Sequence, residues 1–229
     1  MSLLVPPRRF DPTVPEMMDR PGQEITLLRA DLTVLEQINR WLGGHRIPLR
    51  YLKRFQLNRL TLLDLGSGAA DVPRVIARRF AVTITAVDSN PAILQIARER
   101  SIGFDSIHFE QHNLLALPYP AASFDVVLCS LTLHHFTESD TVAILRRILD
   151  IARVGYIIND LRRNRVAIWL SKLMARTIIT NPIARFDAPV SCERAFTRGE
   201  LRVMAERAGM TNFRIRRHPV FRMSLVGMK

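Results

Sequence analysis

Glycines and acidic residues between positions 64 and 88 form the part of the sequence best suited to binding a small ligand. Residues 61–72 read Thr-Leu-Leu-Asp-Leu-Gly-Ser-Gly-Ala-Ala-Asp-Val. The apolar start predicts a buried strand, and Gly66, Ser67 and Gly68 predict a tight turn that brings the backbone close to a ligand. A helix that begins directly after the turn offers unpaired N–H groups and its positive dipole end. The turn therefore suits a nucleotide-like ligand with an anionic group.

Asp88 lies where such a ligand would place a ribose. Residues 82–88 form a second β-branched run, Val-Thr-Ile-Thr-Ala-Val-Asp. An acidic residue at the end of a second strand, about 20 residues past the turn, can bind both ribose hydroxyls. Nicotinamide dehydrogenases share this arrangement, but the Gly-Ser-Gly-Ala-Ala turn fits their glycine fingerprint poorly.

The elements around these residues predict an α/β fold. Strands are expected at 61–65, 82–87, 106–110, 124–129, 154–159, 211–216 and 219–226, and helices at 71–79, 91–100 and 138–150. Strands that are apolar throughout and alternate with helices indicate a doubly wound, mostly parallel sheet, here of seven strands, that is covered on both faces. Because ligands bind beyond the carboxyl ends of such strands, one pocket can gather Asp64, Asp88, Asn113 and residues 130–135.

The first part of the chain is expected to form an arm and a helical cap. Five prolines in residues 1–22 exclude a long helix there and indicate an extended arm. Apolar residues recur at intervals of three and four over 23–42, which predicts an amphipathic helix that ends at a pair of glycines. A shorter helix is expected over 49–55. The chain therefore divides into an arm and cap, 1–59, and a core domain, 60–229.

Several motifs give the core domain a resemblance to a known family. They are Leu-Asp-Leu-Gly-Ser-Gly at 63–68, Val-Asp at 87–88, Asn113, Phe-Asp-Val-Val at 124–127 and Leu-His-His-Phe at 133–136. In these residues the chain resembles the class I S-adenosylmethionine-dependent methyltransferases, in the small-molecule branch similar to the quinone-biosynthesis methyltransferases. The resemblance extends over about residues 60–160. It implies a Rossmann-like methyltransferase fold with S-adenosylmethionine as cofactor.

The resemblance also implies roles for the cofactor-binding residues. The backbone of Gly66, Ser67 and Gly68 would cradle the methionine part of the cofactor, and Asp64 would order the turn and bind the amino group. The other implied contacts are the ribose with Asp88 and Ser89, the adenine with Asn113 and Leu114, and the methionyl end with Ser130.

Two residues depart from the family pattern. Ala70 replaces a third glycine, and we expect a slight shift of the turn. Asn113 replaces an aspartate, which removes a charge but keeps one carbonyl oxygen as an acceptor. We expect both changes to weaken cofactor binding only modestly.

A long segment after the fifth strand, 160–197, is expected to form a lid over the methyl acceptor. Apolar residues on one face predict a helix over 166–179, and residues 186–197 read as a loop. Long insertions in compact domains tend to be lids or binding loops. The apolar face, with Trp169 and Met174, suggests an aromatic or lipid-tailed acceptor, although packing on the core would also explain it.

Two adjacent histidines follow the fourth strand, where the resemblance places the reactive methyl group. A phenol or enol acceptor must lose its proton at or before transfer, and a histidine with an ordinary pKa of about 6.5 is suited to take it. We predict His134 or His135 as the base, unless both only line the pocket, and Asp160 as a further catalytic residue. No spacing of His, Asp and Glu suggests a metal site, so we expect metal-independent transfer. The other acid–base candidates are Arg163, Asp187 and Glu193.

The composition limits location and partners. The 229 residues carry a net charge of +12 and two cysteines without metal or disulfide spacing. No apolar run reaches the roughly 18 residues of a membrane span, so we expect a cytoplasmic protein, with peripheral membrane contact left open. The positive charge fits a solvated surface, an anionic or carrier-bound acceptor, or nucleic acid, but the scattered arginines disfavour nucleic acid.

The leading hypothesis is methyl transfer to oxygen or carbon of a small aromatic, quinol or polyketide-like acceptor. Methylation of RNA or protein is the second hypothesis, and it would require a concentrated basic face. A non-catalytic, S-adenosylmethionine-binding regulatory protein is the third, and it would require the segment 160–197 to fill the acceptor pocket. Ala70 and Asn113 give this third hypothesis some weight.

Overall fold

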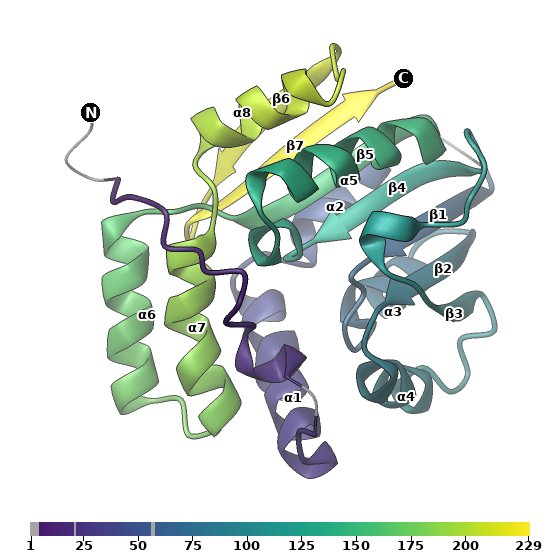
Figure 1. Ribbon diagram of the computed structural model, residues 1–229. Helices are drawn as coiled ribbons and strands as arrows, with labels where there is room; N and C mark the ends of the chain where they lie inside the picture. Colours follow the sequence, from purple (N-terminus) through teal and green to yellow (C-terminus); the bar gives the residue numbers. More distant parts are fainter. Residues whose placement is uncertain (1–4, 21, 56–57) are drawn as a thin grey trace.

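A sheet of seven strands runs through the middle of the protein, as predicted (Figure 1). The computed structural model describes residues 5–20, 22–55 and 58–229; residues 1–4, 21, 56 and 57, which belong to the predicted arm and cap, lie outside the described residues. The strand order is β3-β2-β1-β4-β5-β7-β6. The strands are β1 (Leu60–Leu65), β2 (Val82–Asp88), β3 (Ile107–Gln111), β4 (Phe124–Ser130), β5 (Ala152–Leu161), β6 (Phe213–His218) and β7 (Arg222–Met228).

The pairing of the strands confirms the doubly wound, mostly parallel sheet. Strands β1 to β5 are parallel to one another, and β7 runs antiparallel to both β5 and β6. Helices cover both faces because successive strand residues point to opposite sides. In β1, Leu62 packs with α2 and α3, whereas Leu63 packs with α5 and α8. The core helices are α2 (Arg46–Leu52), α3 (Asp71–Ala77), α4 (Pro91–Arg100), α5 (Glu138–Ile151) and α8 (Arg198–Arg207).

The start of α8 follows a local signal in the sequence. The hydroxyl of Thr197 accepts from the backbone N–H of Glu200 at 3.2 Å, and the Glu200 carboxylate accepts from the backbone N–H of Thr197 at 2.8 Å. This capping box satisfies two backbone donors that the first turn would otherwise leave unpaired.

The N-terminal region contains the two helices that the sequence predicts. The long helix α1 (Ile25–Trp41) is close to its expected range, and the short helix α2 lies three residues earlier than expected at its start. Before α1, the arm makes a single turn, η1 (Met17–Asp19), whose backbone N–H groups at Met17 and Met18 donate to the Asp187 carboxylate at 2.6 and 3.0 Å. Asp187 therefore fastens the arm to the segment that follows β5.

Asp31 of α1 is a buried acid with an unusual pH dependence. Its side chain is 1% exposed, and neither carboxylate oxygen has a hydrogen-bond partner among the described residues. Burial, and then Asp187 and Glu16, raise the pKa of Asp31 from 3.8 to about 7. The folded state therefore holds the proton more tightly than the unfolded state. This tighter binding of the proton increases the free energy of unfolding at low pH. The increase is lost as the pH rises from about 4 to about 7.

The substitution Asp31→Asn is expected to stabilise the protein more at pH 8 than at pH 5. With about 1.4 kcal/mol per pKa unit, the difference in unfolding free energy between variant and wild type should grow by about 2–3 kcal/mol between the two pH values. Urea unfolding of both proteins at both pH values measures it. The same difference at pH 5 and pH 8 would show that Asp31 is ionised normally in the folded protein.

The segment after β5 contains two helices, and the predicted loop at 186–197 is wrong up to residue 194. Helix α6 (Arg165–Thr177) lies within two residues of its predicted range, but α7 (Pro182–Arg194) replaces most of the loop. The side-chain oxygen of Asn181 accepts from the next two backbone N–H groups of the helix, and Pro182 occupies its first position. This is a helix start. Pro189 inside α7 removes one intrahelical hydrogen bond, which is why the stretch resembles a loop in sequence.

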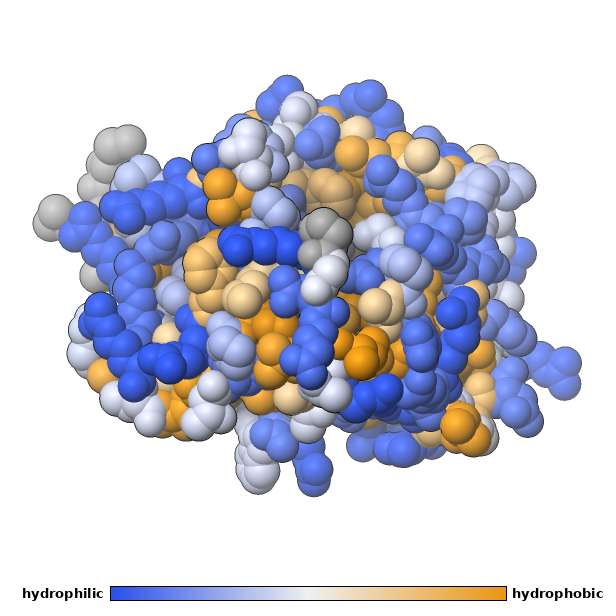
Figure 2. Space-filling view, turned by 60° about the horizontal axis from the view of Figure 1, so that its bottom comes forward, coloured by the Kyte–Doolittle hydropathy of each residue, from blue (hydrophilic) through white to orange (hydrophobic). Residues whose placement is uncertain are grey.

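Helices α6 and α7 pack side by side, and α7 also packs on α1 (Figure 1). Only part of the apolar face of α6 packs against the rest of the protein. Met174 faces the interior, whereas Trp169 is 61% exposed. The alternative that Trp169 packs in the core is therefore wrong. Figure 2 shows apolar surface gathered over the middle of the face formed by the lower ends of these helices. Among the described helices, none is long and apolar enough to cross a bilayer.

Candidate active site

A cavity of about 970 Å³ lies at the carboxyl ends of β1, β2 and β4. Strand ends supply one wall, with Asp64, Asp88 and Ser130. The arm, α1 and the two helices after β5 supply the opposite wall, with Glu16 and Met174 among the lining residues. The cavity therefore lies where a parallel sheet of this type binds its ligand.

The glycine turn after β1 forms a cradle at this cavity. Gly66 has a φ of 68°, and a Cβ there would lie 2.4 Å from the hydroxyl oxygen of Thr132. Gly68 has a φ of 54°, and a Cβ there would meet no atom within 4 Å. The Gly68 N–H donates to the Asp88 carboxylate at 3.0 Å, which ties the turn to the end of β2. Gly66 is therefore required by the fold, whereas Gly68 keeps space open beside the ligand.

Alanine at these two glycines is expected to separate folding from binding. Gly66→Ala should lower the unfolding free energy by more than the roughly 1–2 kcal/mol of left-handed backbone strain, because of the added contact with Thr132. Gly68→Ala should cost only that strain but should weaken binding of S-adenosylhomocysteine at least tenfold. Urea unfolding and calorimetric titration measure the two effects. Equal stability losses, or wild-type affinity in Gly68→Ala, would contradict this assignment.

Ala70 keeps the conformation that a third glycine would adopt. It has a φ of 56° and a ψ of 32°, and it is fully buried at the start of α3. The alanine therefore sustains left-handed backbone strain rather than moving out of that region.

Asp64 fits the binding of a cofactor ammonium group. The side chain is 2% exposed and lines the cavity, and its Oδ1 has no hydrogen-bond partner among the described residues. Burial, and then Asp71 and Asp88, raise the pKa of Asp64 well above its ordinary value. An ammonium group beside this carboxylate would satisfy the oxygen and stabilise its charge. The buried, unpartnered acid therefore matches the methionine end of S-adenosylmethionine.

Asp88 is also poised to bind a ligand. Its two carboxylate oxygens each accept one backbone N–H, from Gly68 and from Asn90, both at 3.0 Å. These bonds fix the orientation of the carboxylate, and each oxygen keeps a lone pair that can accept a ribose hydroxyl. Burial raises the pKa of Asp88, and the two backbone N–H groups oppose this rise.

The remaining predicted cofactor residues divide into two groups. Ser67, Ser89, Leu114 and Ser130 line the cavity. Asn113 is exposed and lies outside the described lining, and its side-chain oxygen accepts from a backbone N–H two residues on, at 2.9 Å. The structure thus gives Asn113 the role of capping a short turn, η2 (Leu114–Ala116). Its contact with the adenine stays a prediction.

His134 lines the same cavity and forms a buried pair with Asp160 behind it. Nδ1 of His134 lies 2.7 Å from Oδ1 of Asp160, and the backbone N–H of His134 donates to Oδ2 at 3.2 Å. Both side chains are 3% exposed. Burial alone would raise the pKa of Asp160, but the charge and the hydrogen bond of His134 lower it. The Asp160 carboxylate can accept the N–H of Nδ1 and so orients the ring, which leaves Nε2 directed away from Asp160.

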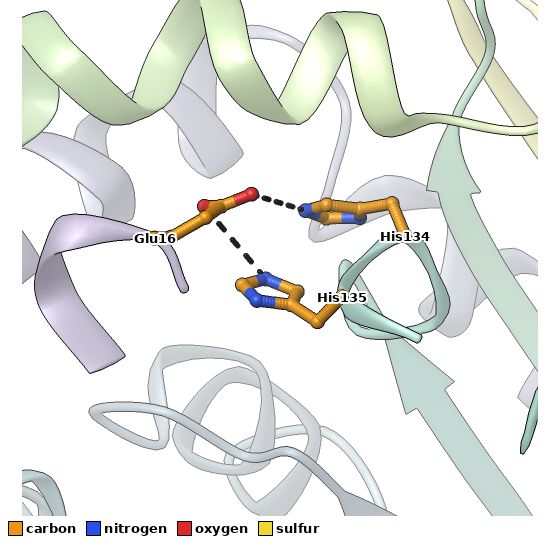
Figure 3. A group of neighbouring side chains, drawn as sticks. All are labelled: Glu16, His134 and His135. Atoms are coloured by element: carbon orange, nitrogen blue, oxygen red, sulfur yellow. Dashed lines mark ion pairs between the residues drawn. The ribbon is translucent and has the colours of Figure 1, made fainter. Parts of the chain in front are cut away.

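His135 and Glu16 complete a cluster with His134 (Figure 3). Nε2 of His134 and Nε2 of His135 lie 3.9 Å from the two carboxylate oxygens of Glu16, one histidine to each oxygen. Nδ1 of His135 lies 2.9 Å from the carboxylate of Asp19. Burial alone would lower the pKa of His135, but Glu16 and then Asp19 outweigh it and raise the pKa to about 9.

The sequence prediction missed three residues of this site. Glu16 and Asp19 lie in the arm, more than 100 positions from the histidines, and nothing local marks them. The third residue, Arg222 of β7, lines the cavity and is 1% exposed. Its Nη2 donates to the side-chain oxygen of Asn39 at 2.9 Å. Its Nε and Nη1 have no acceptor among the described residues. A lone arginine in an apolar terminal strand was the available signal for Arg222.

Each of the three other acid–base candidates has a partner that a structural role would explain. Arg163 pairs with Glu200 at 3.0 Å, Glu193 pairs with Lys172 at 2.6 Å, and Asp187 binds the arm. Burial raises the pKa of Asp187 to about 6. These contacts favour structural roles for all three.

Comparison with known proteins supports the assignment of the domain. Residues 62–155 match the family model described as methyltransferase domain. The chain is 30% identical over 125 residues to a ubiquinone/menaquinone biosynthesis C-methyltransferase of Hahella chejuensis, which covers 50% of the chain and 48% of that protein. It is 33% identical over 95 residues to 6-hydroxytryprostatin B O-methyltransferase of Neosartorya fischeri, which covers 42% of the chain and 23% of that protein. The chain thus spans about half or less of the length of these curated relatives.

Solved structures share the fold at lower identity. A putative O-methyltransferase of Nostoc punctiforme aligns with a TM-score of 0.66 at 18% identity, over 88% of this chain and 59% of that one. Human N-acetylserotonin methyltransferase in complex with S-adenosylmethionine aligns with a TM-score of 0.66 at 16% identity, over 93% of this chain and 61% of that one. The carboxylates of Asp64 and Asp88 and the open space at Gly68 fit S-adenosylmethionine as the cofactor. In the matched domain, the strand order and the cavity at the strand ends, the chain is similar to the class I S-adenosylmethionine-dependent methyltransferases, and one of the relatives it matches is a quinone-biosynthesis enzyme.

Proposed function

We propose that this protein transfers a methyl group from S-adenosylmethionine to an oxygen or carbon of a small aromatic, quinol or polyketide-like acceptor. The observation that carries the proposal is the shared cavity, which brings the cofactor residues Asp64 and Asp88 to the same space as His134, whose ring is held by Asp160. One relative is named for ubiquinone and menaquinone biosynthesis and another for 6-hydroxytryprostatin B, and both names support a ring-bearing acceptor.

One end of the cavity is suited to the cofactor and the other end to the acceptor. When bound, S-adenosylmethionine supplies an electrophilic methyl group, and the protein contributes alignment of the two reactants. Asp64, the glycine turn and Asp88 hold the cofactor end. We assign the reacting atom of the acceptor to the cluster of Glu16, His134 and His135, where Nε2 of His134 can accept its proton.

The wall of the acceptor end is apolar with one buried cation. Leu32, Leu170 and Met174 line it, which suits a ring or an aliphatic chain. Arg222 keeps two donors without acceptors among the described residues, and a buried donor without a partner is costly. An acceptor with a carbonyl or carboxylate oxygen beside Arg222 would satisfy them, so we expect an oxygen-bearing ring compound.

We further propose that the segment 160–197 is the lid of this pocket and receives a lipid-tailed or carrier-bound acceptor. Its helices line the cavity without filling it, which supports catalysis over the purely regulatory alternative. Val166, Trp169 and Leu173 of α6 are more than 40% exposed, beside basic residues such as Arg176. This surface suits brief contact with an anionic membrane.

Nucleic acid is a weaker candidate acceptor. Exposed arginines occur on α2, α4, α5, α6, α7, α8 and β6, and hence are spread over many elements. A nucleic-acid methyltransferase would be expected to concentrate them on one face.

The two cysteines are free thiols, which agrees with the cytoplasmic location that we propose.

Release of S-adenosylhomocysteine in the presence of candidate acceptors tests the function. Phenols, quinols and carrier-bound polyketides form the panel, with tRNA and a mixed peptide library as comparison. Turnover with a member of the first group, and a product heavier by one methylene, is the expected result. Turnover confined to tRNA or peptides would overturn the proposed acceptor class.

A further inference from the structure

The cluster of Glu16, His134 and His135 has the composition of a metal site that the spacing in the sequence does not reveal. One oxygen of Glu16 and one nitrogen of each histidine lie within 4.8 Å of one another (Figure 3). Two imidazoles and one carboxylate are ligands that first-row divalent metals accept, with positions left for other ligands. The 3.9 Å separations are about 0.5 Å longer than the roughly 3.4 Å expected between ligand atoms on a tetrahedral zinc ion.

Both histidines are oriented as metal ligands usually are. Nδ1 of His134 is engaged by Asp160 at 2.7 Å, and Nδ1 of His135 by Asp19 at 2.9 Å. Each ring therefore directs Nε2 towards Glu16. A carboxylate on the far nitrogen fixes the tautomer and raises the basicity of the ligating nitrogen. Two such pairs converging on one carboxylate are more than a single ion pair requires.

Glu16 itself lacks the partners that a buried carboxylate needs. It is 2% exposed, and its Oε1 has no hydrogen-bond partner among the described residues. Its Oε2 accepts from the hydroxyl of Ser191 at 2.9 Å, and a guanidinium nitrogen of Arg194 lies 3.9 Å from Oε1, beyond hydrogen-bond distance. Buried acids and buried arginines, such as Asp187 and Arg194, both lie around it, so the feature that points to a ligand is the Oε1 of Glu16, which no donor within the described residues reaches.

We propose that Glu16, His134 and His135 bind a divalent first-row transition-metal ion whose free positions face the acceptor. This inference rests on the proposed function and specifies it: the acceptor would coordinate the ion through its reacting oxygen. Coordination lowers the pKa of that hydroxyl, so its proton passes to solvent. The oxygen then forms its bond to the methyl group as the sulfur–methyl bond breaks, which yields methyl ether, S-adenosylhomocysteine and one proton. His134 then acts as a ligand and not as the proton acceptor.

Titration of chelator-treated full-length protein with Co²⁺, followed by visible absorption and calorimetry, tests the site directly. We expect one Co²⁺ per chain with bands typical of mixed nitrogen and oxygen ligands. Glu16→Gln should abolish these bands. Asp19→Asn, which removes only the orienting carboxylate of His135, should weaken binding by about 10–100-fold. The matched control is the double variant Glu110→Gln/His112→Asn, which removes another Glu–His pair, 3.1 Å apart, and should bind Co²⁺ as the wild type does.

Other outcomes separate this proposal from the proposed function. Thermal unfolding and binding of S-adenosylhomocysteine, measured without metal, report on the fold and the cofactor site of each variant. If wild-type protein binds S-adenosylhomocysteine but takes up no Co²⁺, or if Glu16→Gln that is folded binds Co²⁺ normally, the metal site is disproved and the methyltransferase assignment stands. Turnover that is unchanged by the chelator would likewise disprove the metal and leave His134 as the proton acceptor.

Discussion

Replacing His134 with Gln is expected to lower the rate of methyl transfer by about 10²–10⁴-fold. Glutamine preserves a polar side chain of similar length but has no lone pair on nitrogen that can accept a proton or bind a metal. The dissociation constant of S-adenosylhomocysteine should stay within about twofold of wild type, because His134 lies at the acceptor end of the cavity. Single-turnover release of S-adenosylhomocysteine with a saturating acceptor measures the rate.

The control for this experiment is His112→Gln. His112 pairs with Glu110 near the end of β3 and lies outside the described lining of the cavity. Its substitution should leave both rate and affinity unchanged. A rate within threefold of wild type for a folded His134→Gln protein would show that the His134–Asp160 pair only supports the wall of the pocket.

Removing the carboxylate of Asp88 is expected to weaken cofactor binding by at least about 100-fold. Two hydrogen bonds from ribose hydroxyls to a charged acceptor stabilise the complex by about 1.5–3 kcal/mol each. Asp88→Ala also releases the Gly68 N–H, which Asp88 holds at 3.0 Å, so the turn loses its tie to β2. Asp88→Asn keeps one oxygen acceptor and should show an intermediate affinity. Calorimetric titration with S-adenosylhomocysteine gives all three dissociation constants.

Asp105→Ala serves as the comparison for Asp88→Ala. Asp105 is likewise an aspartate, but it lies in an exposed turn between α4 and β3. The Asp105→Ala protein should bind S-adenosylhomocysteine with wild-type affinity. An Asp88→Ala protein that binds within fivefold of wild type would move the ribose away from the end of β2.

The core of the fold was predictable because its signals are local. The run Leu62 to Leu65 is apolar and short, a glycine turn follows it, and β-branched residues end at Asp88. Each pattern is complete within about ten residues, and the rule that ligands bind at the carboxyl ends of parallel strands then places Asp64, Asp88 and the residues after β4 in one cavity. The structure places these groups there.

The predictions failed where a local signal was ambiguous or absent. Pro189 made α7 resemble a loop, although Asn181 and Pro182 form a helix start. Glu16 reaches the histidines because Asp187 and Ser191 of α7 help to hold the arm, so its position depends on contacts between distant segments. The sequence spacing that argued against a metal site could not include such a residue.

The central claim is that this cavity binds S-adenosylmethionine, and calorimetric titration of the folded wild-type protein tests it most directly. We expect S-adenosylmethionine and S-adenosylhomocysteine each to bind one site per chain with micromolar dissociation constants. A protein that shows a cooperative unfolding transition but binds neither compound would contradict the claim, and with it the assignment of Asp64 and Asp88.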